Sequence, residues 1–330
     1  MSARVPLPEQ PAGVTWPSAD WPRGAPPPEF REPDWPDLGT THALAVIWRG
    51  RLVHERYGAE HGPDSALISW SVAKSFLHAV VGILVRDGKL DPAARADVPQ
   101  WKTPGDARAA ITLEQLLRMS SGLFWREDYV DAQQSDVIEM LFGEGKDDVA
   151  AFAAHHPLAH PPDTVWCYSS GTSNIVSAIA GRAIGSGAYA EFLRRELFGR
   201  LGMASATVRV DGAGTWIGSS FVFATARDFA RFGLLYLRDG IWAGERILPA
   251  GWVDHARAVT PGSAGEYGAH WWIPPGDEGM FSANGYRGQY LFVAPARDVV
   301  VVRLGESSAE QQPLVREWIR ALIARFPVLG

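Results

Sequence analysis

The sequence has only one cysteine, Cys167, in 330 residues. It can form neither an intrachain disulfide nor a metal site built from several cysteines, and it fits a reducing compartment. Lysine and arginine are scattered without a basic run, and the formal net charge is −6. Because an acidic surface offers no favourable field to nucleic acid or to an anionic membrane, neither is expected as a partner.

Long apolar runs are also missing. No stretch reaches the roughly 18 apolar residues that cross a bilayer, and Met1–Gly13 lacks the apolar region of a signal peptide. We therefore expect a cytoplasmic protein. With 46% hydrophobic and 21% charged residues, the chain can bury the core of one large domain or of two closely joined ones.

Metal and cofactor signatures are sparse. His155, His156 and His160 lie close together in the sequence, but no carboxylates stand near them at ligand spacing, so we expect neither a metal nor a cofactor. The chain also has no Gly-x-Ser-x-Gly, which is the strongest sign of an α/β-hydrolase.

Proline concentrates at the beginning of the chain. Residues 1–38 carry roughly ten of the 24 prolines, interleaved with Trp16, Trp21 and Trp35. Such a segment cannot form a helix or a central strand. It is predicted to be an extended arm that its aromatic side chains hold on the surface.

Both ends of the remaining chain carry β-hairpin patterns. Residues 43–57 and 288–304 each read as two strands joined by a tight turn, and apolar residues at helical spacing follow over 314–326. Residues 39–95 and 206–330 are therefore expected to form an α/β sandwich domain. Its antiparallel sheet would be built from both chain ends and flanked by helices.

The middle of the chain, residues 96–205, is predicted to be an inserted, mainly helical subdomain. The cleft between the two layers is the natural place for a site. The helices expected here are Leu113–Met119, Val137–Leu141, Val149–His155, Ser173–Ile184 and Tyr189–Leu201.

Ser71 and Lys74 open an almost wholly apolar run that ends at Val85. In a helix they lie one turn apart on the same face, so the amine can reach the hydroxyl. A Ser-x-x-Lys alone is common by chance, but a lysine in the first turn of a buried helix needs a reason. Burial and the positive end of the helix dipole both depress a lysine pKa, and a neutral lysine can activate a serine.

Three further segments accompany this pair. Residues 111–123 (ITLEQLLRMSSGL) predict an N-capped helix that ends at a glycine. Residues 166–171 (WCYSSG) form a loop before another apolar helix, and residues 282–289 (SANGYRGQ) lead into a strand. Glycines in that last segment allow a ligand to approach the backbone closely.

In order and spacing, these segments resemble the serine hydrolases with a class C β-lactamase or penicillin-binding-protein fold. The resemblance extends from about residue 40 to the end of the chain, and residues 111–123 are its most specific part. The chain is most similar to the branch that contains 6-aminohexanoate-dimer hydrolases and related carboxylesterases. That branch shares residues 127–131 and 225–228 and the pair Gly288–Gln289.

The resemblance implies a role for each matching residue. Ser71 would be the acylated nucleophile, Lys74 its proton acceptor or relay, and Tyr168 a phenol or phenolate that completes the base system and protonates the leaving group. The backbone N–H groups of Ser71 and Tyr286 would form the oxyanion hole. Substrate contacts are expected at Tyr129, Ser170, Ser219 and Gly285.

The chain also departs from the family. Ala283-Asn284-Gly285 stands where β-lactamases carry Lys-Thr-Gly, so the cation that holds a β-lactam carboxylate is missing and β-lactamase activity is not expected. Ser169 and Ser170 follow Tyr168 in place of Tyr-x-Asn, and the aspartate that grips the amino end of the substrate has no secure counterpart.

The expected function is hydrolysis of a carboxylic ester or a linear amide through an acyl-enzyme on Ser71. One alternative is an amidase acting on 6-aminohexanoate-like oligomers or a peptidase that releases D-residues. Another is a catalytically silent relative that only binds ligands. The partner would be a small ester or amide, and a homodimer is plausible by resemblance only.

Less specific interpretations apply to several residues near these motifs. Tyr168 could be an ordinary core tyrosine, and His78 is more easily a satisfied core histidine than a base. Glu127, Asp128 and Asp131 are most simply a solvated acidic loop that could steer a cationic substrate.

Overall fold

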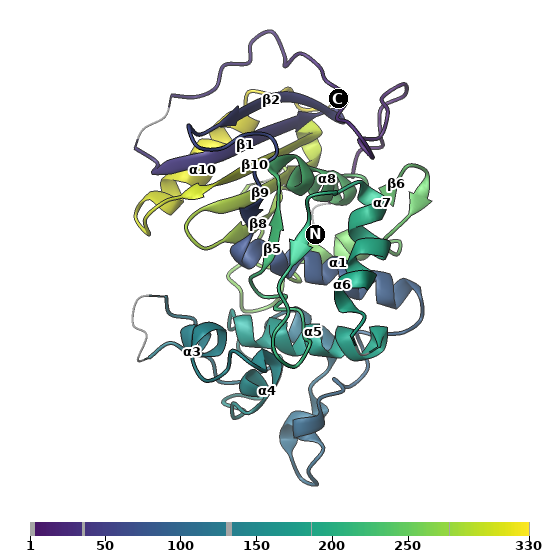
Figure 1. Cartoon of the computed structure of the whole chain (residues 1–330), viewed down its shortest axis with the longest axis vertical. Coiled ribbons are helices and arrows are strands. Elements are labelled where there is room, and N and C mark those ends of the chain that lie inside the picture. Colours follow the sequence, from purple (N-terminus) through teal and green to yellow (C-terminus); the bar gives the residue numbers. More distant parts are fainter. Residues whose placement is uncertain (1–3, 35–36, 130–133, 186, 277, 330) are drawn as a thin grey trace.

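A five-stranded antiparallel sheet joins the two ends of the chain (Figure 1). This computed structural model describes residues 4–34, 37–129, 134–185, 187–276 and 278–329. The strands lie in the order β2-β1-β10-β9-β8. Their bounds are β1 Thr40–Trp48, β2 Arg51–Tyr57, β8 Phe281–Gly285, β9 Gln289–Ala294 and β10 Val299–Glu306.

Both predicted hairpins are present in this sheet. The β1–β2 turn is tight because Arg49 and Gly50 adopt φ values of 51° and 73°, which match the twist of the strands. The β9–β10 turn passes through the short 3-10 helix Pro295–Arg297 and left-handed Asp298. The predicted fold class, an antiparallel sheet from both chain ends with flanking helices, is confirmed.

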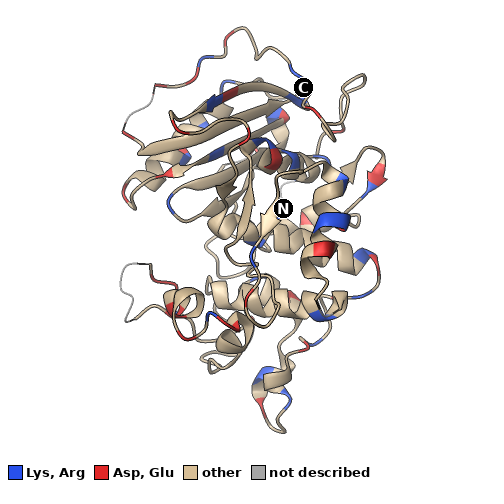
Figure 2. Ribbon diagram, in the orientation of Figure 1, with Lys and Arg blue, Asp and Glu red and all other residues tan. Residues whose placement is uncertain are grey.

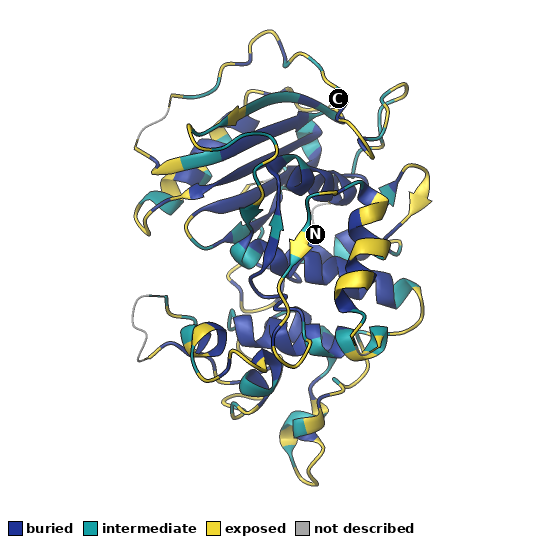
Figure 3. Ribbon diagram, in the orientation of Figure 1, coloured by how far each residue is buried: buried dark blue, intermediate teal, exposed yellow. Residues whose placement is uncertain are grey.

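Helices cover both faces of the sheet. Alternate residues of β1, β9 and β10 pack on one side against α1 (Ala73–Arg86) and α8 (Ala226–Leu237), and on the other against α10 (Gln311–Ile323). Nearly every residue of α1 is buried (Figure 3). The helix that carries Lys74 therefore lies inside the protein.

The middle of the chain is helical. The predicted segments appear as α2 Leu113–Leu117, α3 Asp136–Phe142, α4 Val149–Ala154, α5 Ser170–Ile184, α6 Tyr189–Leu193 and α7 Gly199–Leu201. A π-helical turn, Arg194–Phe198, joins the last two. The remaining short elements are β3 Leu67–Ile68, β4 Thr207–Val208, β5 Val222–Ala224, β6 Ile241–Trp242, β7 Glu245–Arg246, α9 Trp252–Ala256 and the 3-10 turns Trp70–Val72, Pro99–Trp101 and Ala107–Ala110.

The described part of the proline-rich segment, residues 4–34 and 37–38, runs over the surface and contains no helix. Trp16 packs against Trp242 with ring centroids 5.1 Å apart, and the indole N–H of Trp21 donates to the carbonyl of Arg227. Trp35, the third tryptophan, lies outside the described residues. The division into three parts at residues 38, 95 and 205 stays a prediction.

The surface carries charges of both signs. Basic and acidic residues are interspersed over the ribbon (Figure 2). Among the described residues, no helix has both the length and the apolar character that a membrane crossing requires.

A buried ion pair ties the sheet to α8 and to the segment before the sheet. The guanidinium of Arg238 donates to Asp298 Oδ1 at 2.6 Å, to Gln10 Oε1 at 2.9 Å and to the carbonyl of Pro8 at 3.2 Å. The side chains of Arg238 and Asp298 are only 1% and 3% exposed. If one member of this pair is lost, bulk water therefore cannot solvate the charge that remains.

Asp298→Asn is expected to lower the free energy of unfolding by about 3 kcal/mol, because it leaves a buried guanidinium without a negative partner. The matched control is Glu191→Gln, which breaks the exposed pair with Arg194 and should change the free energy by less than about 0.5 kcal/mol. Guanidinium chloride unfolding followed by tryptophan fluorescence measures both. Equal effects of the two substitutions would contradict this account.

Candidate active site

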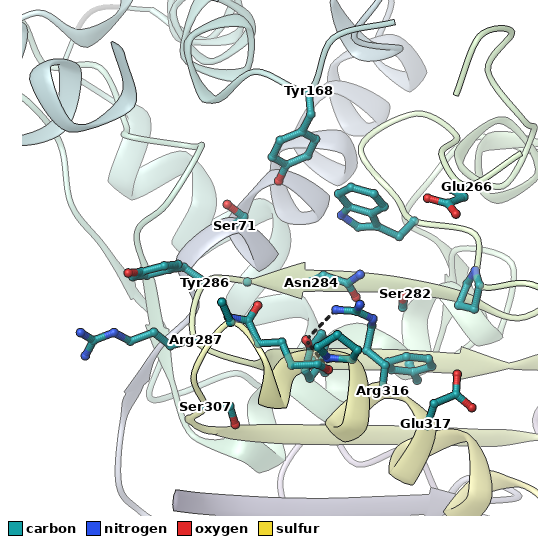
Figure 4. Close-up of a pocket in the computed structure, with 18 of the residues that line it drawn as sticks. Ser71, Tyr168, Glu266, Ser282, Asn284, Tyr286, Arg287, Ser307, Arg316 and Glu317 are labelled. Carbon is teal, nitrogen blue, oxygen red and sulfur yellow. Dashed lines mark hydrogen bonds between the residues drawn. The ribbon is translucent and has the colours of Figure 1, made fainter. Parts of the chain in front are cut away.

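Ser71 lies on a short 3-10 turn, Trp70–Val72, directly before α1. The backbone of Trp70 is left-handed, with φ of 44°, which is strained for a bulky residue. The Trp70 ring is held by an edge contact with Tyr286 and a tilted contact with Phe221, at 5.7 and 5.8 Å between centroids. This kink presents the Ser71 hydroxyl at the mouth of a cleft (Figure 4).

Lys74 lies behind Ser71 and is almost completely buried, with 1% exposed. Its ammonium donates to Ser71 Oγ at 3.0 Å, to Ser170 Oγ at 2.9 Å and to the carbonyl of Ser219 at 3.0 Å. Burial lowers the pKa of Lys74 to about 8, although the negative charge of Glu127 acts in the opposite direction. A neutral amine within hydrogen-bond reach of a serine can act as its base.

Tyr168 approaches Ser71 from the loop before α5. Its hydroxyl points toward Ser71 (Figure 4), and the Lys74 ammonium lies over its ring, 5.0 Å from the centroid. Burial, and then the charge of Glu127, raise the pKa of Tyr168 well above its ordinary value. The raised pKa favours the protonated hydroxyl, and the role of Tyr168 as a phenol or a phenolate stays a prediction.

Glu127 is a site residue that the sequence did not reveal. Its carboxylate accepts hydrogen bonds from the backbone N–H and hydroxyl of Ser170, at 2.8 and 2.5 Å, from the indole N–H of Trp125 at 2.5 Å and from the hydroxyl of Tyr129. The interpretation of Glu127 as part of a solvated loop was wrong. Asp131, of the same predicted loop, lies outside the described residues.

A local signal for this carboxylate was present in the sequence. Trp125 and Tyr129 flank Glu127 at two residues on either side, so in an extended segment all three side chains share one face. Indole N–H and phenol O–H groups both need a partner when they are buried. A carboxylate between them is therefore better placed to accept their hydrogen bonds than to face water.

Gly285 brings the end of β8 against the Ser71 turn. A Cβ atom at this position would lie 2.4 Å from the carbonyl oxygen of Ser69, so a side chain would push β8 away. The following residue, Tyr286, contacts Trp70 and stacks on Tyr129 with centroids 4.8 Å apart. Tyr286 therefore packs against the turn that carries Ser71, and its part in an oxyanion hole stays a prediction.

The predicted residues fall into two groups. Those that line a cleft of about 1040 Å³ are Ser71, Tyr129, Tyr168, Gly285 and Tyr286. Lys74, Ser170 and Ser219 are buried behind the nucleophile instead. Ser219 is fully buried, and its hydroxyl bonds to that of Ser220 at 2.8 Å, so its side chain lies away from the cleft.

The structure also shows the surroundings of His78 and of the groups that could bind a metal. His78 is buried and its ring nitrogens contact Tyr236 and His255, at 2.8 and 3.1 Å, as expected of a satisfied core histidine. The described residues contain no group of three or more histidine, cysteine, aspartate or glutamate side chains placed to hold a metal ion.

Comparison with known proteins gives consistent matches. A family model described as Beta-lactamase matches residues 40–325. The chain is 28% identical over 305 residues to a 6-aminohexanoate-dimer hydrolase of Paenarthrobacter ureafaciens, over 84% of this chain and 75% of the relative.

Solved structures have the same fold. A candidate 6-aminohexanoate-dimer hydrolase from Bacillus anthracis has a TM-score of 0.79 at 23% identity, over 96% of this chain and 89% of that one. A penicillin-binding protein from Bacillus halodurans has a TM-score of 0.69 at 18% identity, over 87% and 98%.

The position of Glu127 predicts how the reactivity of Ser71 depends on pH. Only the neutral amine of Lys74 can accept the serine proton, so the rate of phosphonylation by a fluorophosphonate should rise with pH through about 8. Glu127→Gln removes a charge that raises the Lys74 pKa and should move this inflection to lower pH. Intact mass, measured over roughly pH 6 to 10, gives the rates.

The matched control is Glu266→Gln, which neutralises another carboxylate of the cleft. It should move the inflection less than Glu127→Gln does. An inflection that stays in place or rises in Glu127→Gln would contradict the assigned electrostatic role.

Proposed function

The chain belongs to the beta-lactamase family, which confirms the resemblance predicted from its sequence, and on this basis we propose that it hydrolyses a carboxylic ester or a linear amide through an acyl-enzyme on Ser71. The observation that carries the proposal is the buried amine of Lys74, 3.0 Å from Ser71 Oγ, with its pKa lowered to about 8. A catalytically silent relative that only binds ligands has no need of such an amine. The broader assignment, a hydrolase of this family, does not depend on the substrate.

In acylation, the neutral Lys74 takes the proton of Ser71, and the serine oxygen attacks the carbonyl carbon. The backbone N–H groups of Ser71 and Tyr286 stabilise the oxyanion. Tyr168 gives its phenol proton to the leaving alcohol or amine as the carbonyl bond to that group breaks. The Lys74 ammonium over the tyrosine ring then offsets the negative charge of the phenolate.

In deacylation, Tyr168 and Ser71 regain the protons that they lost in acylation. The Tyr168 phenolate takes a proton from water, and the hydroxide attacks the acyl carbon. Ser71 Oγ leaves with a proton from the Lys74 ammonium, which restores all three residues and releases the carboxylic acid. We infer that Ser170 and Ser219 hold the amine of Lys74 in place, which differs from the substrate contacts expected for them from the sequence.

The substrate preference follows from the leaving group. Esters should be the easier substrates, because an alcohol leaves with less need of protonation than an amine does. The second candidate is an amidase, which the similarity to a 6-aminohexanoate-dimer hydrolase and the phenol of Tyr168 favour. A peptidase that releases D-residues is a further alternative within the same mechanism.

Several accompanying properties stay predictions. We expect no significant β-lactamase activity, because Ala283-Asn284-Gly285 replaces Lys-Thr-Gly. Tyr129 and Gly285 are proposed to contact the substrate, since both line the cleft. A cytoplasmic location and a homodimer are retained from the sequence as expectations.

Ser71→Ala should lower kcat/KM for a short-chain ester by on the order of 10³-fold or more, since the nucleophile is lost. Tyr168→Phe should cost about 10²–10⁴-fold, the usual contribution of a positioned proton donor. Hydrolysis of ethyl butyrate, followed by titration of the acid released, measures both because its alkoxide leaving group needs a proton, and circular dichroism verifies folding. Ester hydrolysis that persists in well-folded Ser71→Ala would rule out this nucleophile.

The amidase candidate predicts release of monomer from the linear 6-aminohexanoate dimer. Because an amine must be protonated to leave, Tyr168→Phe should slow this reaction more than it slows hydrolysis of an activated aryl ester. Chromatographic quantification of 6-aminohexanoate measures the amide reaction. No release under conditions where esters are turned over would remove this candidate.

A further inference from the structure

The turn between β8 and β9 contains a strained residue. The N–H of Gly288 donates to the carbonyl of Gly285 at 3.2 Å and closes the turn. Arg287, its third residue, is left-handed with φ of 60°, as in a type II turn. Glycine is the usual residue at that position, because a side chain there crowds the backbone. The sequence of the turn therefore does not favour this conformation, and contacts from outside the turn must hold it.

The three carbonyls that follow Gly285 in the turn all accept hydrogen bonds from the strands behind it or from the residue after β10. The pairs are Tyr286 O with Gln289 Nε2 at 3.0 Å, Arg287 O with the N–H of Ser307 at 2.9 Å, and Gly288 O with Arg303 Nη1 at 2.8 Å. The N–H of Tyr286, in contrast, donates no hydrogen bond to any of the described residues. The turn is thus fixed through its acceptors, and one donor is left over.

The direction of the Tyr286 N–H follows from the turn. In a trans peptide the C=O and the N–H point in opposite directions. Because the carbonyl of Gly285 faces Gly288 inside the turn, the N–H of Tyr286 faces the outside. Figure 4 shows Tyr286 at the end of β8, below Ser71. This donor is therefore available to a ligand in the cleft that both residues line.

The amide of Gln289 is held in one orientation. Gln289 is buried, with 4% exposed. Its Nε2 donates to the carbonyls of Tyr286 and Gly305, at 3.0 and 2.6 Å, and its Oε1 accepts from the N–H of Gly305 at 2.9 Å. The two contacts with Gly305 decide which way the amide faces. Gln289 thereby connects β10 to the peptide bond between Tyr286 and Arg287.

This contact selects the conformation of the turn. Type I and type II turns differ by a flip of their central peptide, which here lies between Tyr286 and Arg287. In a type I turn Arg287 would have a negative φ without strain, but the carbonyl of Tyr286 would point away from Gln289. Loss of the Gln289 hydrogen bond would therefore free the central peptide to flip. The adjacent peptide, which carries the N–H of Tyr286, would then lose its fixed orientation.

We propose that Gln289 is a positioning residue for the oxyanion hole: by holding the carbonyl of Tyr286, it keeps the N–H of Tyr286 directed at the carbonyl oxygen of the substrate. This inference rests on the proposed function, which assigns that N–H to the oxyanion hole. Gln289 is not among the described residues that line the cleft, so it acts on the reaction through the turn.

Gln289→Met tests the proposal by kinetics, because it keeps the length of the side chain and removes its three hydrogen bonds. It should lower kcat for ethyl butyrate by about 10- to 100-fold with little change in KM, since complete loss of one oxyanion-hole donor costs about 10²–10³-fold. Intact mass after complete labelling with a fluorophosphonate counts the reactive sites. The value of kcat then refers to folded protein alone.

Gln311→Met is the matched control, because it removes the hydrogen bonds of another glutamine with Ser308 and Asp37 at the start of α10. It should leave kcat unchanged. If Gln289→Met does not fold, Gln289→Glu is measured in its place. That variant keeps the acceptor for the N–H of Gly305 but donates to neither carbonyl, and the same loss of kcat is expected.

Arg287→Gly separates positioning from a general loss of stability. Glycine adopts a left-handed φ without strain, so the turn needs less support when glycine replaces Arg287. Gln289→Met/Arg287→Gly should therefore recover kcat by about threefold or more over Gln289→Met, although no hydrogen bond is restored. A substitution that only destabilised the fold would not be corrected in this way.

A butyl trifluoromethyl ketone, labelled with ¹³C at its carbonyl carbon, reports on the oxyanion directly. Ser71 Oγ bonds to that carbon, the serine proton passes to Lys74, and the carbonyl oxygen becomes the oxyanion of a hemiketal. NMR titration gives the pH at which this oxyanion takes up a proton. In Gln289→Met that pH should be about one unit higher than in the wild-type protein, because the oxyanion is less well stabilised.

The outcomes separate this inference from the proposed function. If the wild-type protein hydrolyses ethyl butyrate and Gln289→Met retains both its kcat and the pH of its ketone adduct, the role of Gln289 is rejected and the hydrolase mechanism stands. If the wild-type protein neither hydrolyses esters nor forms the adduct, the proposed function is rejected, and the role of Gln289 with it.

Discussion

The site depends on one buried positive charge, the ammonium of Lys74. A charged amine inside a protein is costly unless it is paired and hydrogen-bonded. Its three donors reach Ser71 Oγ, Ser170 Oγ and the carbonyl of Ser219, and the carboxylate of Glu127 accepts from Ser170 in turn. The start of α1, the start of α5 and the turn before β5 are therefore linked through a single nitrogen atom, and Ser170 joins the segment around Glu127 to them.

The same arrangement sets the chemistry. Direct contact with a carboxylate would keep Lys74 protonated, so that it could not act as a base. Without any negative charge nearby, the burial of a charged amine would cost too much free energy. Glu127 is placed between these extremes, because it acts on Lys74 through Ser170 and not by direct contact. The balance leaves the pKa of Lys74 at about 8, close to the pH at which a base is most effective.

Much of the fold could be predicted, because periodic patterns report on burial. The valines of β10 predict a central strand, and the apolar run of α1 predicts a buried helix. The spacing of Ser71 and Lys74 predicts that their side chains lie close together. The burial of Glu127 could have been predicted from Trp125 and Tyr129, but its link to Lys74 could not, since the connecting residue, Ser170, is 43 residues away in the sequence. The contact of Ser219 with Lys74 could not be predicted either. It uses the backbone carbonyl of Ser219, a group that every residue carries.

The most direct test of the central claim is the pKa of Lys74 itself. The chain has four lysines, so NMR of protein labelled at lysine Cε gives a spectrum simple enough to titrate residue by residue. The account predicts one signal that titrates at about 8, disappears in Lys74→Arg and moves to lower pH in Glu127→Gln. Four signals that all titrate near the ordinary lysine pKa of about 10.4 would contradict it, because Lys74 would then remain a cation at the pH where it is required to act as a base.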